Sequence, residues 1–429
     1  MLNLTSTRCA SSQQYNSEIT VDTVPLSTLL SSDNFDAQGH LSLGPTQVLI
    51  KVRAVALSNL DTEVSAGQWQ FHHAANANAN ASATATPTTT LSTTTATLPF
   101  VTGYEFSGVV VSVGSAVARM NTLLLAESKN HESTTHTHHR QATVRKGQAV
   151  VGLAPIDQRL GCLSEYTVQN VSCLIPKPAL VLHEDAASIV GPGLRAMTAL
   201  HYHTTPRVDD TILVVQGASP TGRLTIQLAV HLGLRVLAMG DTAEQLNYLE
   251  DLGARVSGQL GSLVRVLDSR QGPEVILLQV MEETGYMGVD SIFESDTSNS
   301  TSSQNSESSA TEGDDKNRNI DLKRVMLECL GTNGTYVTTR RDLQLDPGES
   351  KRLALKGASL SFVFEQTWVL SPSKQGRYLH IMNQIMNYLS DGTLGTLVGG
   401  DCTSLGRARE AYREIQKGET LGRTVVKID

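Results

Sequence analysis

The sequence predicts an α/β protein in which a doubly wound parallel sheet is inserted after a glycine-rich β domain, with a C-terminal return that completes the β domain. The first third of the chain contains short strand-like runs punctuated by glycine. The middle alternates apolar strand-like runs with helical patterns, which indicates a parallel sheet covered on both faces. The tail returns to strand-like runs. We therefore expect domains over 1–180, 181–357 and 358–429.

In the β domain, the clearest strand is Gln47–Ala56, whose apolar residues recur with a period of two. Phe106–Gly114 and Gln148–Leu153 are shorter β runs that contain glycine. In the tail, β pattern starts at Ala358–Val363, and helices are expected over 376–389 and 405–415.

The α/β part opens with a helix near Glu184, which has acidic residues in its first turn. Strand 211–216, helix 223–231 and strand 235–239 then form the β-α-β unit of a Rossmann-type dinucleotide-binding fold. The further elements expected here are helices over 242–252 and 322–330 and strands over 274–278, 289–293 and 334–339.

Three segments have compositions that cannot build a core. Residues 74–97 are rich in Ala, Asn, Thr and Ser, residues 121–142 carry a Thr/His tract, and residues 296–319 are Ser-rich and then acidic. Such segments bury too little apolar surface to offset the entropy of ordering them. We expect all three to be disordered surface insertions.

Composition excludes several classes of protein. The net charge of −8 over 429 residues, without a basic stripe, argues against direct nucleic-acid binding. No apolar run is long enough to span a membrane, and residues 1–8 lack the apolar core of a signal peptide. Five scattered cysteines, an odd number, indicate free thiols in a reducing compartment, so we expect a cytoplasmic protein.

The turn after strand 211–216 is the strongest candidate for a ligand site. It reads Gly217-Ala-Ser-Pro-Thr-Gly222, which is Gly-x-Ser-x-x-Gly and not Gly-x-Gly-x-x-Gly. Backbone amides of Gly217, Ala218, Ser219, Thr221 and Gly222 would meet a pyrophosphate at the helix N-terminus. Ser219 adds bulk where the cofactor comes closest, and Pro220 removes one amide. The sequence predicts weakened dinucleotide binding, or a turn that only joins strand to helix.

The end of strand 235–239 bears on the choice of cofactor. Gly240 leaves room for a larger ribose substituent, whereas Asp241 either takes the ribose 2′-hydroxyl of NAD or repels the phosphate of NADP. No Lys or Arg occurs between Met239 and Gly253, so the local residues favour NAD(H).

Ordered motifs along nearly the whole chain outside the insertions resemble the medium-chain dehydrogenase/reductase superfamily, and within it the zinc-free, zeta-crystallin-like quinone oxidoreductase branch. The motifs are Val48–Ala54, Gly103–Gly108, Thr198–Leu200, Gln227–Ala229, Leu252–Ala254, Thr284–Asp290, Leu343–Pro347, Leu355–Ala358, Gln375–Leu379 and Gly422–Val426. The resemblance implies a GroES-like β domain, NADP(H) as cofactor, and Thr198 among the cofactor-binding residues. NAD(H) stays open beside NADP(H).

Zinc ligands of the superfamily are missing from this sequence. Ser58 stands where the first cysteine would be, and Tyr104 replaces the histidine in Gly103-Tyr-Glu105. Zinc requires sulfur or nitrogen donors in tetrahedral geometry, so no metal is expected. The cluster His136, His138 and His139 lies in the Thr/His tract and is interpreted as a solvated loop with incidental metal affinity.

The resemblance places candidate catalytic residues on the loop after the first long strand and in the vacated metal position. These are Ser58, Asn59 and Tyr104, with Asp61 and Trp69 at neighbouring matching positions. Tyr104 would donate a proton or hydrogen bond to a substrate oxygen. The alternative is a packed aromatic ring that fills the space left by the metal. Ser107 is expected to be a buried strand residue, since no nucleophile elbow surrounds it.

Two functions follow from these observations. The first is a zinc-independent, NAD(P)H-dependent oxidoreductase that reduces a quinone, enone or other carbonyl acceptor by hydride transfer. The second is a weak or inactive pseudo-enzyme that acts as an interaction subunit, because the glycine fingerprint is incomplete, the zinc ligands are missing and the insertions are acidic or His-rich. The resemblance to a subunit type of an early-endosomal assembly linked to mRNA transport fits this hypothesis. The resemblance also implies a homodimer joined at sheet edges, with Thr335–Arg340 and Leu360–Phe364 as the candidate strands.

Overall fold

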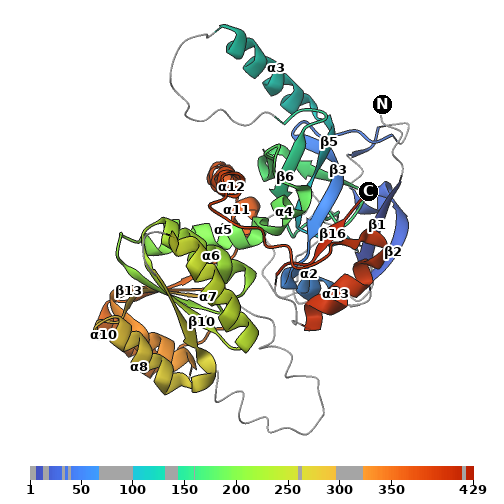
Figure 1. Ribbon diagram of the computed structural model, residues 1–429. Helices are drawn as coiled ribbons and strands as arrows, with labels where there is room; N and C mark the ends of the chain where they lie inside the picture. Colours follow the sequence, from blue (N-terminus) through green and yellow to red (C-terminus); the bar gives the residue numbers. More distant parts are fainter. Residues whose placement is uncertain are drawn as a thin grey trace, which may run out of the picture. The chain divides into compact units, whose positions relative to one another are not determined.

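The computed structural model describes residues 6–12, 19–30, 34–36, 40–66, 100–130, 144–158, 160–258, 263–295, 322–417 and 422–429. The chain forms two compact units (Figure 1). Unit 1 comprises Met1–Val190, Gln366–Met386 and Val398–Asp429, and unit 2 comprises Gly191–Glu365 and Asn387–Leu397. The insertions predicted at 74–97 and 296–319 lie outside the described residues.

Unit 1 is built on a seven-stranded sheet ordered β15-β16-β3-β5-β6-β8, with β7 also paired to β3. The strands are β3 Gln47–Ala56, β5 Glu105–Val113, β6 Ala149–Leu153, β7 Tyr166–Asn170, β8 Leu174–Pro176, β15 Thr403–Ser404 and β16 Val425–Lys427. A smaller sheet joins β1 Ser6–Ser12, β2 Ile19–Pro25 and β4 Phe100–Val101. Because β16 pairs antiparallel with β3, the predicted C-terminal return to the β domain is confirmed.

Short helices surround the sheets of unit 1. They are α1 Leu26–Leu29, α2 Asn59–Ser65, α3 Ser115–Asn130, α4 His183–Ser188, α11 Thr367–Leu370 and α13 Ala408–Lys417, while α12 Gln375–Ser390 runs from unit 1 into unit 2. Helix α3 corrects the expected insertion at 121–142, because helical structure continues to Asn130. Within α3, the buried side-chain amide of Asn121 donates to the carbonyl of Val144 at 2.7 Å.

Unit 2 contains a six-stranded sheet ordered β11-β10-β9-β12-β13-β14, in which every pairing is parallel. The strands are β9 Thr211–Val215, β10 Arg235–Gly240, β11 Val264–Asp268, β12 Val289–Glu294, β13 Leu330–Thr338 and β14 Ser359–Phe362. The helices are α5 Val190–Thr198, α6 Pro220–His231, α7 Ala243–Ser257, α8 Pro273–Glu283, a helix over 322–329, and α10 Pro347–Lys356. Helices α6 and α7 cover one face, and α8 and α10 cover the other (Figure 1). The predicted Rossmann sheet is confirmed.

Two expectations for unit 2 were wrong. The apolar run at 274–278 is not a strand but part of α8, which Pro273 opens at the first helical position. Its fully buried residues, Ile276 and Val280, recur at the helical spacing of four, and the missed strand is β11. The tail does not return to unit 1 at 358, because β14 first pairs with β13 as the edge strand. Consequently β13 is not an edge, and Thr335–Arg340 is not available for joining two sheets.

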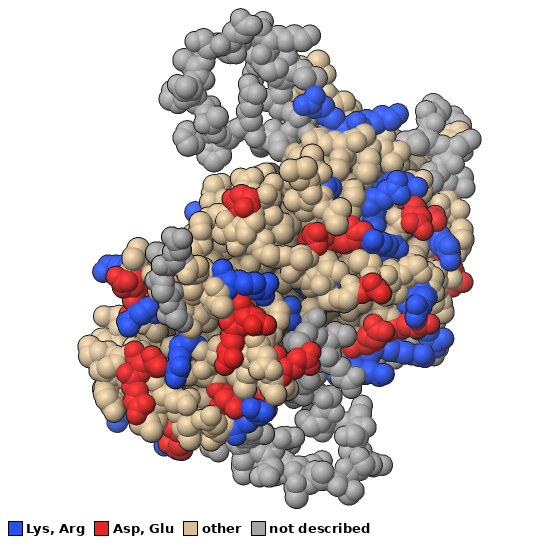
Figure 2. Space-filling model, viewed as in Figure 1, with Lys and Arg blue, Asp and Glu red and all other residues tan. Residues whose placement is uncertain are grey.

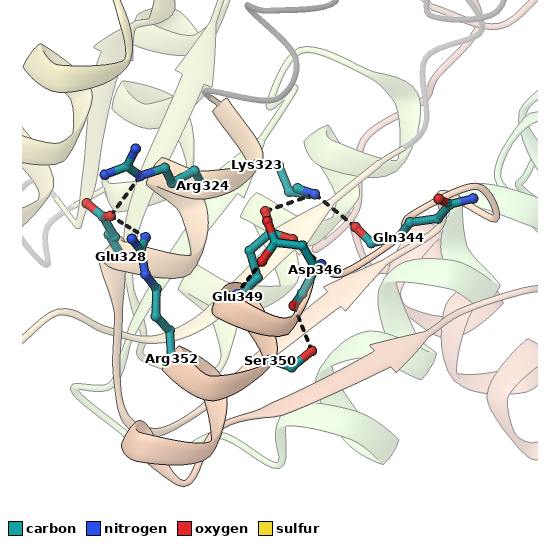
Figure 3. A network of polar contacts seen from close by, with 8 residues as sticks. All are labelled: Lys323, Arg324, Glu328, Gln344, Asp346, Glu349, Ser350 and Arg352. Atoms are coloured by element: carbon teal, nitrogen blue, oxygen red, sulfur yellow. Dashed lines mark hydrogen bonds and ion pairs between the residues drawn. The ribbon is translucent and has the colours of Figure 1, made fainter.

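Helix α10 is fixed to the helix that precedes β13 by a polar network (Figure 3). The Lys323 ammonium lies 2.9 Å from the Glu349 carboxylate, and both side chains are largely buried. Glu349 and Asp346 form a capping box at the start of α10. Farther along, Glu328 pairs with Arg352 at 2.5 Å. The network holds α10 in place beside β13.

On the face shown in Figure 2, acidic and basic side chains are interspersed. No helix in the described part of the chain has the length and apolar character needed to cross a membrane.

Candidate functional site

The turn between β9 and α6 has the tight geometry that its two glycines permit. A Cβ on Gly222 would lie 2.4 Å from the carbonyl oxygen of Gln216, so α6 can start this close to the turn only with glycine there. The Gly217 amide donates to the carbonyl of Met239 in β10 at 2.8 Å, which ties the turn to the neighbouring strand. Gln216 itself has a φ of 51°, in the left-handed region.

Ser219 is the N-cap of α6, and its hydroxyl oxygen accepts a hydrogen bond from the Gly222 amide at 3.0 Å. Pro220 occupies the first helical position and has no amide hydrogen. The Ser219 amide donates to the carbonyl of Gln216 at 3.0 Å. Among the described residues, the amides of Ala218 and Thr221 have no such partner, and they are the donors that the turn retains for an anion.

Arg223, next to Gly222, is a site residue that the sequence reasoning missed. Its guanidinium is buried, and Nε donates to the carbonyl of Ala218 at 2.8 Å. The Nη2 nitrogen has no hydrogen-bond partner among the described residues. The tight turn closed by Gly222 and the buried Nη2 donor of Arg223, which has no partner there, both fit a ligand that carries phosphate, such as NAD(P)H. The available signal was a single charged residue in the otherwise uncharged first turns of the helix.

The end of β10 bears on the choice of cofactor. A Cβ on Gly240 would lie 3.0 Å from Leu246 of α7, so the backbone passes close to that helix. Asp241 is exposed, and its amide donates to the side chain of Gln245 at 3.1 Å. Asp268 of the neighbouring strand β11 is in register with Gly240. It forms a bidentate ion pair with Arg270, at 2.8 and 2.7 Å. The carboxylates of Asp241 and Asp268 therefore lie at the ends of β10 and β11, and the nearby guanidinium of Arg270 is already paired.

Two further groups lie in unit 2. Thr198 ends α5 and is nearly buried, and a π-helical turn at Ala199–Thr204 follows it, a feature frequent at functional sites. At the carboxyl end of β12, buried Glu294 accepts hydrogen bonds from the hydroxyls of Tyr336 and Thr338, at 2.8 and 3.0 Å. Glu294 is in register with Val215 of β9, so this network stiffens the sheet at the carboxyl ends of its strands, next to the turn.

In unit 1, Asp61 organises the loop before α2. Its carboxylate accepts from the amide and hydroxyl of Ser58, at 2.7 and 2.9 Å, and from the Gly103 amide at 2.8 Å. Burial raises the pKa of Asp61 from 3.8 to about 6. The Ser58 hydroxyl is thereby committed to Asp61, while Asn59 opens α2 and its carbonyl accepts from Thr62. Both predicted residues position the loop that packs against Gly103.

Tyr104 lies beside this loop with its ring buried. Burial raises the pKa of the phenol well above its usual 10, and the nearby Asp61 carboxylate adds to the rise. The hydroxyl is therefore protonated at neutral pH and acts as a hydrogen-bond donor. No partner for it is found within the described residues. Trp69 lies outside the described residues.

Ser107 and His183 form a pair without the geometry of a nucleophile. The Ser107 hydroxyl lies 2.8 Å from His183 Nδ1 and donates to the carbonyl of Val150 at 2.8 Å. Since the Ser107 hydroxyl also has the Val150 carbonyl as an acceptor, the contact with His183 alone does not identify a nucleophile and its base. Ser107 is a buried residue in the middle of β5.

No group of three or more His, Cys, Asp or Glu side chains in the described part of unit 1 or unit 2 is placed to hold a metal. His136, His138 and His139 lie outside the described residues.

The chain is similar in sequence and in fold to proteins named as oxidoreductases. Residues 44–179 match the alcohol dehydrogenase GroES-like domain. Quinone oxidoreductase-like protein 1 of Mus musculus is 30% identical over 322 residues, which cover 72% of this chain and 88% of the mouse protein. The chloroplastic NADPH-dependent alkenal/one oxidoreductase of Arabidopsis thaliana is 31% identical over 48% of this chain and 43% of its own. A mycobacterial protein solved with NADPH shares the fold, with a TM-score of 0.67 and 20% identity over 99% of this chain and 100% of that one.

Proposed function

Because the chain belongs to the medium-chain dehydrogenase/reductase superfamily, as a homologue of quinone oxidoreductase-like protein 1, we propose that it is a zinc-independent NAD(P)H-dependent reductase of quinones, enones or related carbonyl compounds. The observation that carries the proposal is the turn at Gly217–Gly222. Its glycines hold α6 tightly against β9, and the amides of Ala218 and Thr221 remain as donors at the helix N-terminus.

In this proposal the turn holds the pyrophosphate of the cofactor, with Thr198, Gly240 and Asp241 as the further cofactor-binding residues. NAD(P)H supplies a hydride when it is bound. The carboxylates at the ends of β10 and β11 favour NADH, whereas the Arabidopsis relative is named for NADPH. Both cofactors are therefore included in the proposal, and a direct comparison of their affinities decides between them.

Tyr104 is proposed as the residue that stabilises the reduced acceptor. Hydride addition to a quinone or enone leaves negative charge on an oxygen atom, and a hydrogen bond from the protonated phenol stabilises that charge. Since its pKa is raised, Tyr104 keeps its proton, and solvent completes the reduction by protonating the oxygen. Ser58 and Asn59 hold the loop beside it.

Replacing Tyr104 with Phe tests this role. We expect kcat for quinone reduction to fall about a hundredfold, because one donor to a developing oxyanion is lost. The Kd for NADPH should not change. Tyr378→Phe is the matched control: Tyr378 is also buried in unit 1, but its hydroxyl is occupied by the Leu153 amide and the Cys173 carbonyl, at 2.9 Å each. Equal activity of folded Tyr104→Phe and wild type would refute the assignment.

A second candidate function is supported by the same turn. Ser219 occupies the Gly222 amide and Pro220 lacks one, so two donors of a complete phosphate-binding turn are lost. This favours a weakly active or inactive protein that serves as an interaction subunit, with early endosomes as the proposed location. Affinity purification that recovers the chain without partners would contradict it.

For self-association, the edge strand β14 is the remaining candidate, and a monomeric mass in solution would exclude it.

A further inference from the structure

Arg223 has an unusual position for a cation. It is the fourth residue of α6, directly after the turn, and only 6% of the residue is exposed. Its Nε donates to the carbonyl of Ala218 at 2.8 Å, which fixes the guanidinium against the turn itself. Most arginines at comparable burial form ion pairs or networks.

No carboxylate neutralises the charge of Arg223 within the described residues, where the Tyr248 side chain is its electrostatic partner. Arg223 forms no ion pair with a described carboxylate, and its buried Nη2 has no hydrogen-bond partner there. The guanidinium carbon lies 4.0 Å from the centre of the Tyr248 ring of α7, so the aromatic face supplies part of the compensation. Burial lowers the pKa of Arg223, as expected for a cation withdrawn from water.

The helix makes this arrangement still less favourable. The N-terminus of α6 carries the positive end of the helix dipole, where cations are disfavoured and anions are favoured. A buried guanidinium and a helix N-terminus therefore place two positive potentials at one turn. A bound anion at the turn would offset both.

We propose that Arg223 binds a phosphate of the dinucleotide and supplies the positive charge that replaces the amides lost through Ser219 and Pro220. The inference rests on the proposed function, because the dinucleotide is the anion in question. Arg223 contributes to binding, not to the reacting atoms, so its effect belongs in the Kd for the cofactor.

The direct test is calorimetric titration of Arg223→Met and Arg223→Gln with NADH and NADPH at low and high salt. We expect Kd to rise about tenfold or more in both variants, since a charged hydrogen bond is lost. The salt dependence of Kd should become shallower, because one cation no longer contacts the ligand. Arg223→Gln retains a polar side chain at the carbonyl of Ala218, and it keeps the test valid if Arg223→Met does not fold.

Arg255→Met is the matched control. Arg255 faces the same Tyr248 ring at 6.0 Å but is exposed, so its removal should leave both Kd and salt dependence unchanged. An equal loss for NADH and NADPH assigns Arg223 to the pyrophosphate, and a loss confined to NADPH assigns it to the 2′-phosphate.

A lowered melting temperature with unchanged Kd and salt dependence would show that Arg223 is only structural, which overturns the proposal. That result is distinguishable from failure of the proposed function, in which the wild-type protein itself binds neither dinucleotide.

Discussion

Ser219 determines how many backbone donors the turn offers to a ligand. Its hydroxyl oxygen accepts the Gly222 amide proton that a glycine at this position would leave free. The same contact caps α6, so the side chain stabilises the helix while it competes with an anion for the amide.

Ser219→Gly should bind NADPH and NADH about two- to tenfold more tightly, because one amide becomes available, and calorimetry measures this directly. Stability should fall by only a few tenths of a kcal/mol, since glycine is tolerated at the N-cap. Asp346→Gly removes the cap of α10, away from the turn, and should leave both affinities unchanged. Weaker or equal binding by Ser219→Gly would show that the turn amides do not limit affinity.

Asp61 makes stability depend on pH. Its folded pKa of about 6 lies above 3.8, so the folded state binds the proton more tightly than the unfolded state. The stability it contributes is present below pH 4 and is lost as pH rises through about 6. Relative to Asp61→Asn, wild type should lose about 3 kcal/mol of unfolding free energy between these limits. Chemical denaturation of both proteins at several pH values measures the difference, and a pH-independent difference would contradict the assignment.

At the scale of elements, the end of the chain is tied to the sheet of unit 1 by a buried ion pair. Arg423, just before β16, lies 2.8 Å from Glu105 at the start of β5, and both side chains are at most 5% exposed. The pair joins the last strand to a central strand of the same sheet.

Arg423→Met should destabilise unit 1 by about 3–5 kcal/mol, because a buried carboxylate is left without its partner. The double variant Glu105→Gln with Arg423→Met should recover part of the loss. Lys427→Met removes the ion pair of the exposed Lys427 with Glu184 and should cost far less than Arg423→Met. Urea denaturation of the four proteins measures these differences. A small effect of Arg423→Met would mean that β16 is held by strand pairing alone.

The elements also show what the sequence can predict. Gly217, Gly222 and the apolar strands around them have strong local signals, so the β-α-β unit and the parallel sheet were predicted correctly. Residues 274–278 were misassigned, because a short apolar run has no clear period and Pro273 was the deciding feature. Arg223 and Glu294 were missed, because their importance depends on burial and on partners in other elements.

At the scale of the whole molecule, the two units divide the proposed chemistry. Unit 1 carries Tyr104 and the loop ordered by Asp61, and unit 2 carries the turn, Arg223 and the stiffened sheet edge. The proposed reductase activity requires both, whereas the proposed dinucleotide binding requires the turn. Binding is therefore the property that separates the reductase from an interaction subunit that no longer holds a cofactor.

The most direct measurement is calorimetric titration of the purified full chain with NADPH and with NADH, beside the variant Gly222→Val. The proposed function predicts saturable binding of at least one dinucleotide to wild type and its loss in the variant, because a side chain at 222 collides with the carbonyl of Gln216. No binding of either dinucleotide up to millimolar concentration by folded wild-type protein would contradict the proposal that the turn at Gly217–Gly222 holds a cofactor.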